Sequence, residues 1–265
     1  MNKRYLGALI LSPLIIFLFI GGKYLKALIF LISLRGMYEF YKAIEKKIEP
    51  VSILGYVLCI VYYLFILNTE INGELFFYIS ILAVFILMLM PIFNEKYNFI
   101  SGGVTLLGFI YVAIFFSFII LVNSKMYGNY LIWLIFLSSW VCDTFAYYSG
   151  KYFGKKKLCP KISPKKTIEG SIGGLLGSVI GCTIFGVFSI NRGVDISLIH
   201  FILIGAISGI LSQLGDLVAS SIKRYVDVKD YSQLIPGHGG ILDRFDSILF
   251  SSVTVFYYLT FIINI

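Results

Sequence analysis

The sequence has little charge for its length. Only 14% of its 265 residues are Asp, Glu, Lys or Arg, whereas soluble domains average about 25%. At the same time 58% of the residues are hydrophobic, and a soluble fold of this size cannot bury that much apolar surface. The shortage of charge therefore excludes an ordinary cytosolic enzyme, a disordered chain and a coiled coil. It predicts an integral membrane protein.

Cysteine is scarce as well, and its spacing forms no motif. The four cysteines make neither a CxxC pair nor a zinc-like pattern with histidine, which excludes a secreted disulfide scaffold. Cys59, Cys142 and Cys182 lie in apolar runs, so we expect them to pack in the interior. The nucleotide-binding patterns GxxxxGK[ST] and GxGxxG are absent, and the chain contains no internal repeat.

Long apolar runs, in contrast, are abundant. A membrane-spanning helix needs about 20 mostly apolar residues, and such runs do not alternate like the strands of a membrane β-barrel. Nine segments qualify, of which the second is the weakest because charges enter its last turns: 5–21, 25–41, 51–68, 75–93, 100–122, 129–150, 171–190, 198–219 and 247–264. We predict an all-α polytopic membrane protein with about nine transmembrane helices, five in an N-terminal region 1–128 and four in a catalytic region 129–265.

The positive charges orient the chain. If the N-terminus is cytoplasmic, 18 of the 22 lysines and arginines fall inside and four outside. Cytoplasmic loops of membrane proteins carry such an excess, so the net charge of +8 indicates inside loops rather than nucleic-acid binding. We predict an inner-membrane protein with its C-terminus outside, and the high usage of Ile, Lys and Asn, typical of an AT-rich bacterial genome, favours a bacterial one. Its longest cytoplasmic segments, 151–170 and 220–246, should hold the active site at the ends of the C-terminal helices.

The end of the eighth predicted span carries a polar face. Asp216, Ser220, Lys223, Arg224 and Asp227 follow one another at helical i+3/i+4 spacing. A carboxylate at membrane depth is costly and is a functional candidate for that reason. The face could hold a metal and phosphates. The alternative is a helix that simply ends among headgroups, with its cations in the basic belt of the inner membrane surface.

A glycine-rich loop follows, with the sequence Ile235-Pro236-Gly237-His238-Gly239-Gly240. Exposed backbone N–H groups in such loops suit phosphate oxygens. Asp243 and Asp246 then open the last span three residues apart, and carboxylates beside substrate phosphates are the usual surroundings of Mg²⁺. Taken singly, a simple hairpin loop and helix capping also explain these features.

These residues resemble the phosphatidate cytidylyltransferase family, also called CDP-diacylglycerol synthases. Residues 220–246 match the family signature at every specified position, including Lys223-Arg224, Lys229-Asp230 and Asp243-Arg244-Phe245-Asp246. Two upstream stretches also look like the family, Asp143-x2-Ala146-Tyr147-x2-Gly150 and Ser163-Pro164-x-Lys166-Thr167-x-Glu169-Gly170. The resemblance covers roughly residues 140–250, while the first 130 residues match only as apolar spans.

The resemblance implies transfer of CMP from CTP to phosphatidate with Mg²⁺, giving CDP-diacylglycerol and pyrophosphate. On this basis we expect Asp216, Asp243 and Asp246 to bind the metal and to act with Lys223 and Arg224 in catalysis. The expected phosphate and nucleotide contacts are Asp143, Ser163, Lys166, Thr167, Ser220, Lys229, His238, Gly239, Gly240 and Arg244. They should surround a polar cavity between predicted spans six, eight and nine, open to the inner leaflet and to cytoplasmic water.

Several alternatives stay open at this point. A CTP-dependent enzyme acting on a polyprenol-type or archaeal ether lipid would use the same phosphate-binding residues. An ion-coupled transporter would instead place polar residues near the middle of several spans, whereas here they lie mostly at cytoplasmic ends. A second, monovalent cation and a homodimer are further open alternatives.

Overall fold

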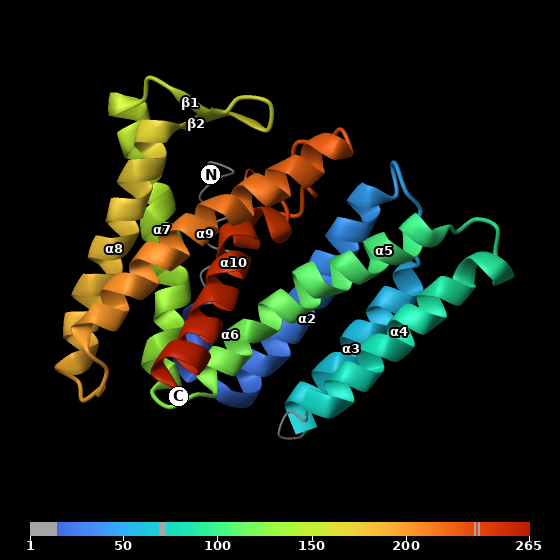
Figure 1. Cartoon of the computed structure of the whole chain (residues 1–265), viewed down its shortest axis with the longest axis horizontal. Coiled ribbons are helices and arrows are strands. Elements are labelled where there is room, and N and C mark those ends of the chain that lie inside the picture. Colours follow the sequence, from blue (N-terminus) through green and yellow to red (C-terminus); the bar gives the residue numbers. More distant parts are fainter. Residues whose placement is uncertain (1–14, 69–72, 236, 238) are drawn as a thin grey trace.

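Long helices make up nearly all of the protein (Figure 1). The computed structural model describes residues 15–68, 73–235, 237 and 239–265. The helices are α2 (Gly22–Ile44), α3 (Ser52–Asn68), α4 (Gly73–Phe93), α5 (Phe99–Gly108), α6 (Phe115–Asn123), α7 (Gly128–Phe153), α8 (Ile168–Ile190), α9 (Leu198–Tyr225) and α10 (Leu242–Tyr258). Two π-helical turns, η1 (Phe109–Ile114) and η2 (Leu259–Ile263), join α5 to α6 and extend α10.

The helices have the length and composition of a multi-pass membrane protein. Within the described residues, five are long and apolar enough to cross a membrane: Phe99–Asn123, α7, α8, α9 and Leu242–Ile263. Two shorter apolar helices lie at Ser52–Leu67 and Tyr78–Phe93. The first predicted span, 5–21, falls mostly outside the described residues. The helical multi-pass architecture therefore agrees with the prediction, whereas the number of nine spans stays a prediction.

The outer face of α8 is apolar along its length. Ile172, Leu176, Ile180 and Ile184 follow one another at i+4 spacing, and each is at least half exposed. Residues four apart lie on one face of a helix, so these side chains form one continuous stripe. Such a stripe on a soluble protein would be a large exposed apolar patch, whereas on this chain it suits contact with lipid.

The inner face of α8 is lined by small residues that let α7 approach closely. Gly177 faces Phe145 of α7, and a Cβ atom at Gly177 would lie 2.5 Å from Cγ of Phe145. Helix pairs in membranes are held mainly by such close packing, because lipid gives little hydrophobic driving force between helices. The glycine therefore sets the distance between the two helices that flank the site described below.

Aromatic packing ties α10 to the N-terminal helices. The rings of Phe116 in α6 and Phe245 in α10 lie 5.2 Å apart, centroid to centroid, and both side chains belong to the buried core. α10 also contacts α2, α7 and α9. Cys59, Cys142 and Cys182 are buried free thiols, which confirms their predicted packing role.

The segment between α7 and α8 adds one small sheet to the helical fold, which stays consistent with the all-α prediction. It contains a two-stranded antiparallel sheet of β1 (Lys157–Cys159) and β2 (Ser163–Thr167), in which Lys157 pairs with Thr167. The carboxylate of Glu169, in the first turn of α8, accepts hydrogen bonds from the backbone N–H groups of Lys155 and Lys156. These bonds fasten the hairpin to the end of the helix bundle.

The polar segments gather at one end of the molecule. The hairpin, the end of α9 and the start of α10 lie toward the upper end in Figure 1, and the C-terminus and the α8–α9 connection lie at the lower end. The four C-terminal helices also contact one another: α7 contacts α8, α9 and α10, and α9 contacts α8 and α10. This arrangement places residues 151–170 and 220–246 at the same end of the helix bundle. The predicted topology, in which both segments are on the cytoplasmic side of the membrane, requires this.

Replacing Gly177 by valine should destabilise the helix pair. The added side chain would overlap the Phe145 ring, and overpacking of this kind costs about 1–3 kcal/mol. We therefore expect a lower unfolding temperature of the purified protein in detergent micelles. Leu176 lies one residue earlier, on the exposed face of α8. Leu176→Val is therefore the matched control and should unfold near the wild-type temperature. Equal unfolding temperatures for the two variants would contradict this description of the α7–α8 contact.

Candidate active site

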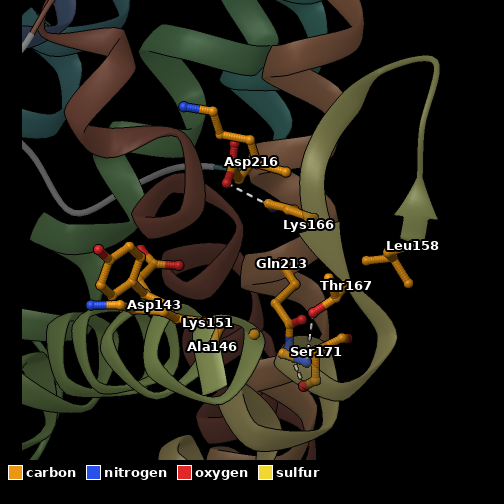
Figure 2. A pocket seen from close by; sticks show the side chains of 13 residues that line it. Asp143, Ala146, Lys151, Leu158, Lys166, Thr167, Ser171, Gln213 and Asp216 are labelled. Carbon is orange, nitrogen blue, oxygen red and sulfur yellow. Dashed lines mark hydrogen bonds and ion pairs between the residues drawn. The ribbon is translucent and has the colours of Figure 1, made fainter. Parts of the chain in front are cut away.

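A cavity of about 370 Å³, lined by charged and polar side chains together with apolar ones, opens between α7, the hairpin, the start of α8 and α9. Its charged lining residues are Asp143 and Lys151 of α7, Lys165 and Lys166 of β2, and Asp216 of α9 (Figure 2). The predicted cavity lay between spans six, eight and nine. The structure agrees on α7 and α9, the sixth and eighth spans, but the hairpin and α8 take the place predicted for the last span.

Lys166 and Asp216 face each other across this cavity (Figure 2). Nζ of Lys166 lies 2.7 Å from Oδ2 of Asp216, and about a quarter to a third of each side chain is exposed. The hydroxyl of Ser220 donates to Oδ1 of Asp216 over 3.3 Å, which confirms the predicted shared helix face for these two residues. A partly solvated ion pair is weak, so an incoming phosphate or cation can replace either partner at little cost.

The hairpin carries two other predicted substrate contacts, Ser163 and Thr167, and only Thr167 lines the cavity. Thr167 lines the cavity, and its Oγ1 accepts a hydrogen bond of 3.1 Å from the N–H of Gly170, which caps α8. Such a cap satisfies one of the free N–H groups at a helix start. Ser163 begins β2 and pairs with Cys159, and it is not among the described residues that line the cavity.

Asp243 has a complete set of protein partners. Nζ of Lys223 lies 2.7 Å from its Oδ1, with only 9% of the lysine and 2% of the aspartate side chain exposed. Its Oδ2 accepts hydrogen bonds from the N–H groups of Tyr231 and Gly240 over 2.8 and 2.9 Å. Asp243 and Lys223 thus join α9, the following loop and α10. Neither residue is among those that line the cavity, and their predicted metal-binding and catalytic roles stay predictions.

The carboxylates that converge near the cavity are Asp143, Asp216 and Asp246. Asp143 accepts a hydrogen bond from the Ser247 hydroxyl over 3.3 Å, and Asp246 accepts one from the Ser247 N–H over 2.8 Å. Both carboxylates lie close enough to Asp216 for like-charge repulsion. Within the described part of the chain, however, no three His, Cys, Asp or Glu side chains are grouped closely enough to form a ready-made metal site.

Arg224 lies away from the cavity, contrary to its expected position. It is exposed, and it donates hydrogen bonds to the carbonyl oxygens of Ile162 and Val228 over 3.4 and 3.1 Å. Lys223 is buried, so these two neighbours do not share one face of α9 as predicted. Successive residues of a helix point about 100° apart, and burial of one side chain leaves the other outside.

Asp227 also leaves the predicted face, because it follows the end of α9 with a φ of 56°. It pairs with Lys47, which lies just after α2, over 2.7 Å. The hydrogen bond between them raises the pKa of Lys47 and lowers the pKa of Asp227. Both side chains are well exposed, so this pair should contribute little to stability.

The remaining predicted contacts lie in or near the glycine-rich loop. Lys229 and Arg244 are exposed and are not among the described lining residues, although Arg244 interacts electrostatically with Asp143. Gly239 has a φ of 81°, a conformation that favours glycine. His238, like Pro236, lies outside the described residues, and its predicted contact stays a prediction.

The sequence interpretation missed several polar residues of the cavity, among them Lys151, Lys165, Ser171 and Gln213. Nε2 of Gln213 donates to the carbonyl oxygens of Ser171 and Gly209 over 3.2 and 3.0 Å, and thereby connects α9 to α8. A glutamine three residues before Asp216 in an apolar run was a usable signal, because i and i+3 share a helix face. Lys151 was taken as part of the general positive charge of the loop.

Comparisons with known proteins bear on the whole chain. Residues 2–262 match the model of the cytidylyltransferase family. A phosphatidate cytidylyltransferase of Bacillus subtilis (strain 168) is 34% identical over 258 residues, which is 94% of each chain. That of Haemophilus influenzae is 42% identical over 142 residues, 53% of this chain and 49% of the relative. That of Staphylococcus aureus (strain COL) is 36% identical over 159 residues, 59% and 58% of the two chains.

Proposed function

The chain belongs to the cytidylyltransferase family, and we propose that it is a phosphatidate cytidylyltransferase. In this reaction CTP and phosphatidate give CDP-diacylglycerol and pyrophosphate. Similarity along 94% of the chain to a protein of that name carries the proposal. The cavity supports it, because lysines and aspartates meet there at the end of a bundle of apolar helices.

This reaction needs neutralisation of the negative charges on the phosphates rather than a strong general base. An oxygen of the phosphatidate phosphate attacks the α-phosphorus of CTP, and a new P–O bond forms. The bond to the oxygen that leads to the β-phosphate breaks, and pyrophosphate leaves with that electron pair. Since the attacking phosphate is already anionic, catalysis consists mainly of positioning and electrostatic stabilisation. We propose that Lys151, Lys165 and Lys166 bind phosphate oxygens of the substrates. Lys166 would give up its ion pair with Asp216 to do so.

Asp143 and Asp216, which line the cavity, and the nearby Asp246 fit a divalent cation that arrives with the nucleotide. Mg²⁺ prefers oxygen ligands and is usually held by one or two carboxylates together with substrate phosphates. Asp143, Asp216 and Asp246 offer such oxygens from three helices, and their mutual repulsion would be relieved by a cation. When bound, Mg²⁺ would offset the charge of the triphosphate. We assign Asp243 a supporting role, because Lys223 and two N–H groups already occupy its oxygens.

We also propose the topology that suits these substrates. Nine spans, a cytoplasmic N-terminus and an outside C-terminus in the inner membrane would put the cavity beside cytoplasmic CTP. Phosphatidate would enter from the inner leaflet near Tyr147, an exposed aromatic residue that lines the cavity. Aromatic side chains are common at the membrane–water boundary, where a lipid phosphate also lies. A homodimer and a second, monovalent cation are compatible with this arrangement.

The proposed reaction predicts acceptor-dependent release of pyrophosphate. Purified protein in micelles with CTP and Mg²⁺ should release pyrophosphate when phosphatidate is added, with one CDP-diacylglycerol formed per pyrophosphate. Diacylglycerol is the matched control and should give no product, because it lacks the attacking phosphate. Reaction only with an archaeal ether-lipid phosphate, or transfer to a polyprenol, would replace the proposed acceptor. Unchanged CTP with every acceptor would contradict the proposed function.

Asp216→Asn should nearly abolish turnover while leaving the fold intact. The substitution keeps the shape and one oxygen but removes the charge that would face a cation or Lys166. Loss of about 4 kcal/mol of transition-state stabilisation corresponds to a roughly thousandfold slower rate. The exposed Asp195, before α9 at the opposite end of the bundle, provides the control Asp195→Asn, which should match wild type. CDP-diacylglycerol formation across a Mg²⁺ titration measures both. A near-normal rate and metal dependence for Asp216→Asn would exclude its proposed role.

A further inference from the structure

A buried carboxylate in the N-terminal half of the chain contacts the loop before α10. Glu39 lies in α2, and only 1% of the residue is exposed. Burial of a carboxylate costs free energy unless hydrogen bonds or an opposite charge compensate it. The proposed reaction does not use this side chain, so its burial calls for another explanation.

The partners of Glu39 lie at the two ends of that loop. Oε1 accepts a hydrogen bond of 2.7 Å from the hydroxyl of Ser232, and Oε2 accepts one of 3.0 Å from the N–H of Leu242. The guanidinium of Arg35, one turn earlier in α2, lies 3.4 Å from Oε1. A single carboxylate thus holds both ends of residues 232–242 against α2, 193 and 203 positions away along the chain.

Glu39 takes the place of a capping residue for α10. Leu242 is the first residue of that helix, and Ile241 before it has an aliphatic side chain that cannot accept a hydrogen bond. The first N–H groups of a helix have no partner within the helix, and a negative charge at this end interacts favourably with the helix dipole. Asp243 accepts from the N–H of Gly240, so two carboxylates from different helices share the start of α10.

Gly240 is the residue that makes room for this contact. A Cβ atom at position 240 would lie 2.3 Å from Oε2 of Glu39, well inside van der Waals contact. Any larger residue would have to push the carboxylate away from Leu242. The glycine of the loop and the glutamate of α2 therefore form one structural unit.

We infer that Glu39 is a positioning residue for the reaction proposed above. It fixes the start of α10, whose first two turns carry Asp243 and Asp246. The inference rests on the proposed function, because Glu39 can position residues for catalysis only if the reaction takes place beside these carboxylates. Misplacement of a reacting group by about 1 Å can cost about a hundredfold in rate, so an anchor distant from the cavity can still control turnover.

The kinetic test compares Glu39→Gln and Glu39→Ala with Lys47→Met. Lys47 is a second, solvent-exposed link, which joins the segment after α2 to Asp227 just after α9, and this makes it the matched control. We expect Glu39→Ala to lower kcat by about tenfold to a hundredfold with a much smaller change in KM for CTP. Glu39→Gln keeps the shape and one acceptor oxygen and should recover part of that loss. Lys47→Met should resemble wild type.

Gly240→Ala makes the test specific to the Glu39 contact. Alone, this variant should lower kcat because the new methyl group displaces the carboxylate. In the Glu39→Ala background the methyl group meets no carboxylate, so it should add little further loss. Additive losses would mean that the two residues act separately and would overturn the inference, as would a normal kcat for Glu39→Ala.

A spin label separates failure of this inference from failure of the proposed function. Leu234 is exposed within the anchored loop, and a label on Leu234→Cys reports loop motion without any substrate. Its mobility should rise in Glu39→Ala and stay unchanged in Lys47→Met, at similar unfolding temperatures. If wild type makes no CDP-diacylglycerol, the function fails and label mobility alone decides the anchoring. An immobile label in Glu39→Ala would overturn it.

Discussion

The geometry of the candidate site depends on the buried ion pair between Lys223 and Asp243. Among the ion pairs of the described residues it is the most fully shielded from water, since 9% and 2% of the two side chains are exposed. A buried charge is tolerated only when its partners are complete, and the N–H groups of Tyr231 and Gly240 complete this carboxylate. The end of α9, the loop and the start of α10 must therefore keep one relative position.

The contrast with Lys166 and Asp216 explains where chemistry can take place. This second lysine–aspartate pair has the same length of 2.7 Å, but it faces a cavity and a quarter to a third of each side chain is exposed. Solvent weakens such a pair, so under the proposed function its partners are exchanged for phosphate or metal more readily than those of Lys223 and Asp243. The two lysine–aspartate pairs thus differ in burial. We assign the buried pair to holding α9 and α10 in place and the exposed pair to binding a ligand.

Local spacing in the sequence predicted what depends on local contacts. Apolar runs gave helices at the predicted positions throughout the described residues. The i, i+4 spacing of Asp216 and Ser220 predicted their shared helix face, on which Ser220 donates a hydrogen bond to Asp216. The hairpin was not predicted, because β2 has the polar, lysine-containing sequence SPKKT and shows no alternation of apolar residues. The partners of Glu39 were not predicted for another reason, because contacts across 193 and 203 positions leave no periodic signal.

A double-mutant cycle on Lys223 and Asp243 tests the dependence on this ion pair most directly. Equilibrium unfolding in mixed micelles would compare Lys223→Met, Asp243→Asn and the double variant with wild type. We expect each single substitution to lower the free energy of unfolding by about 3–5 kcal/mol, because it leaves an uncompensated buried charge. The double variant should regain most of that loss. Single variants as stable as wild type, or losses that simply add, would contradict a buried pair that holds α9 and α10 together.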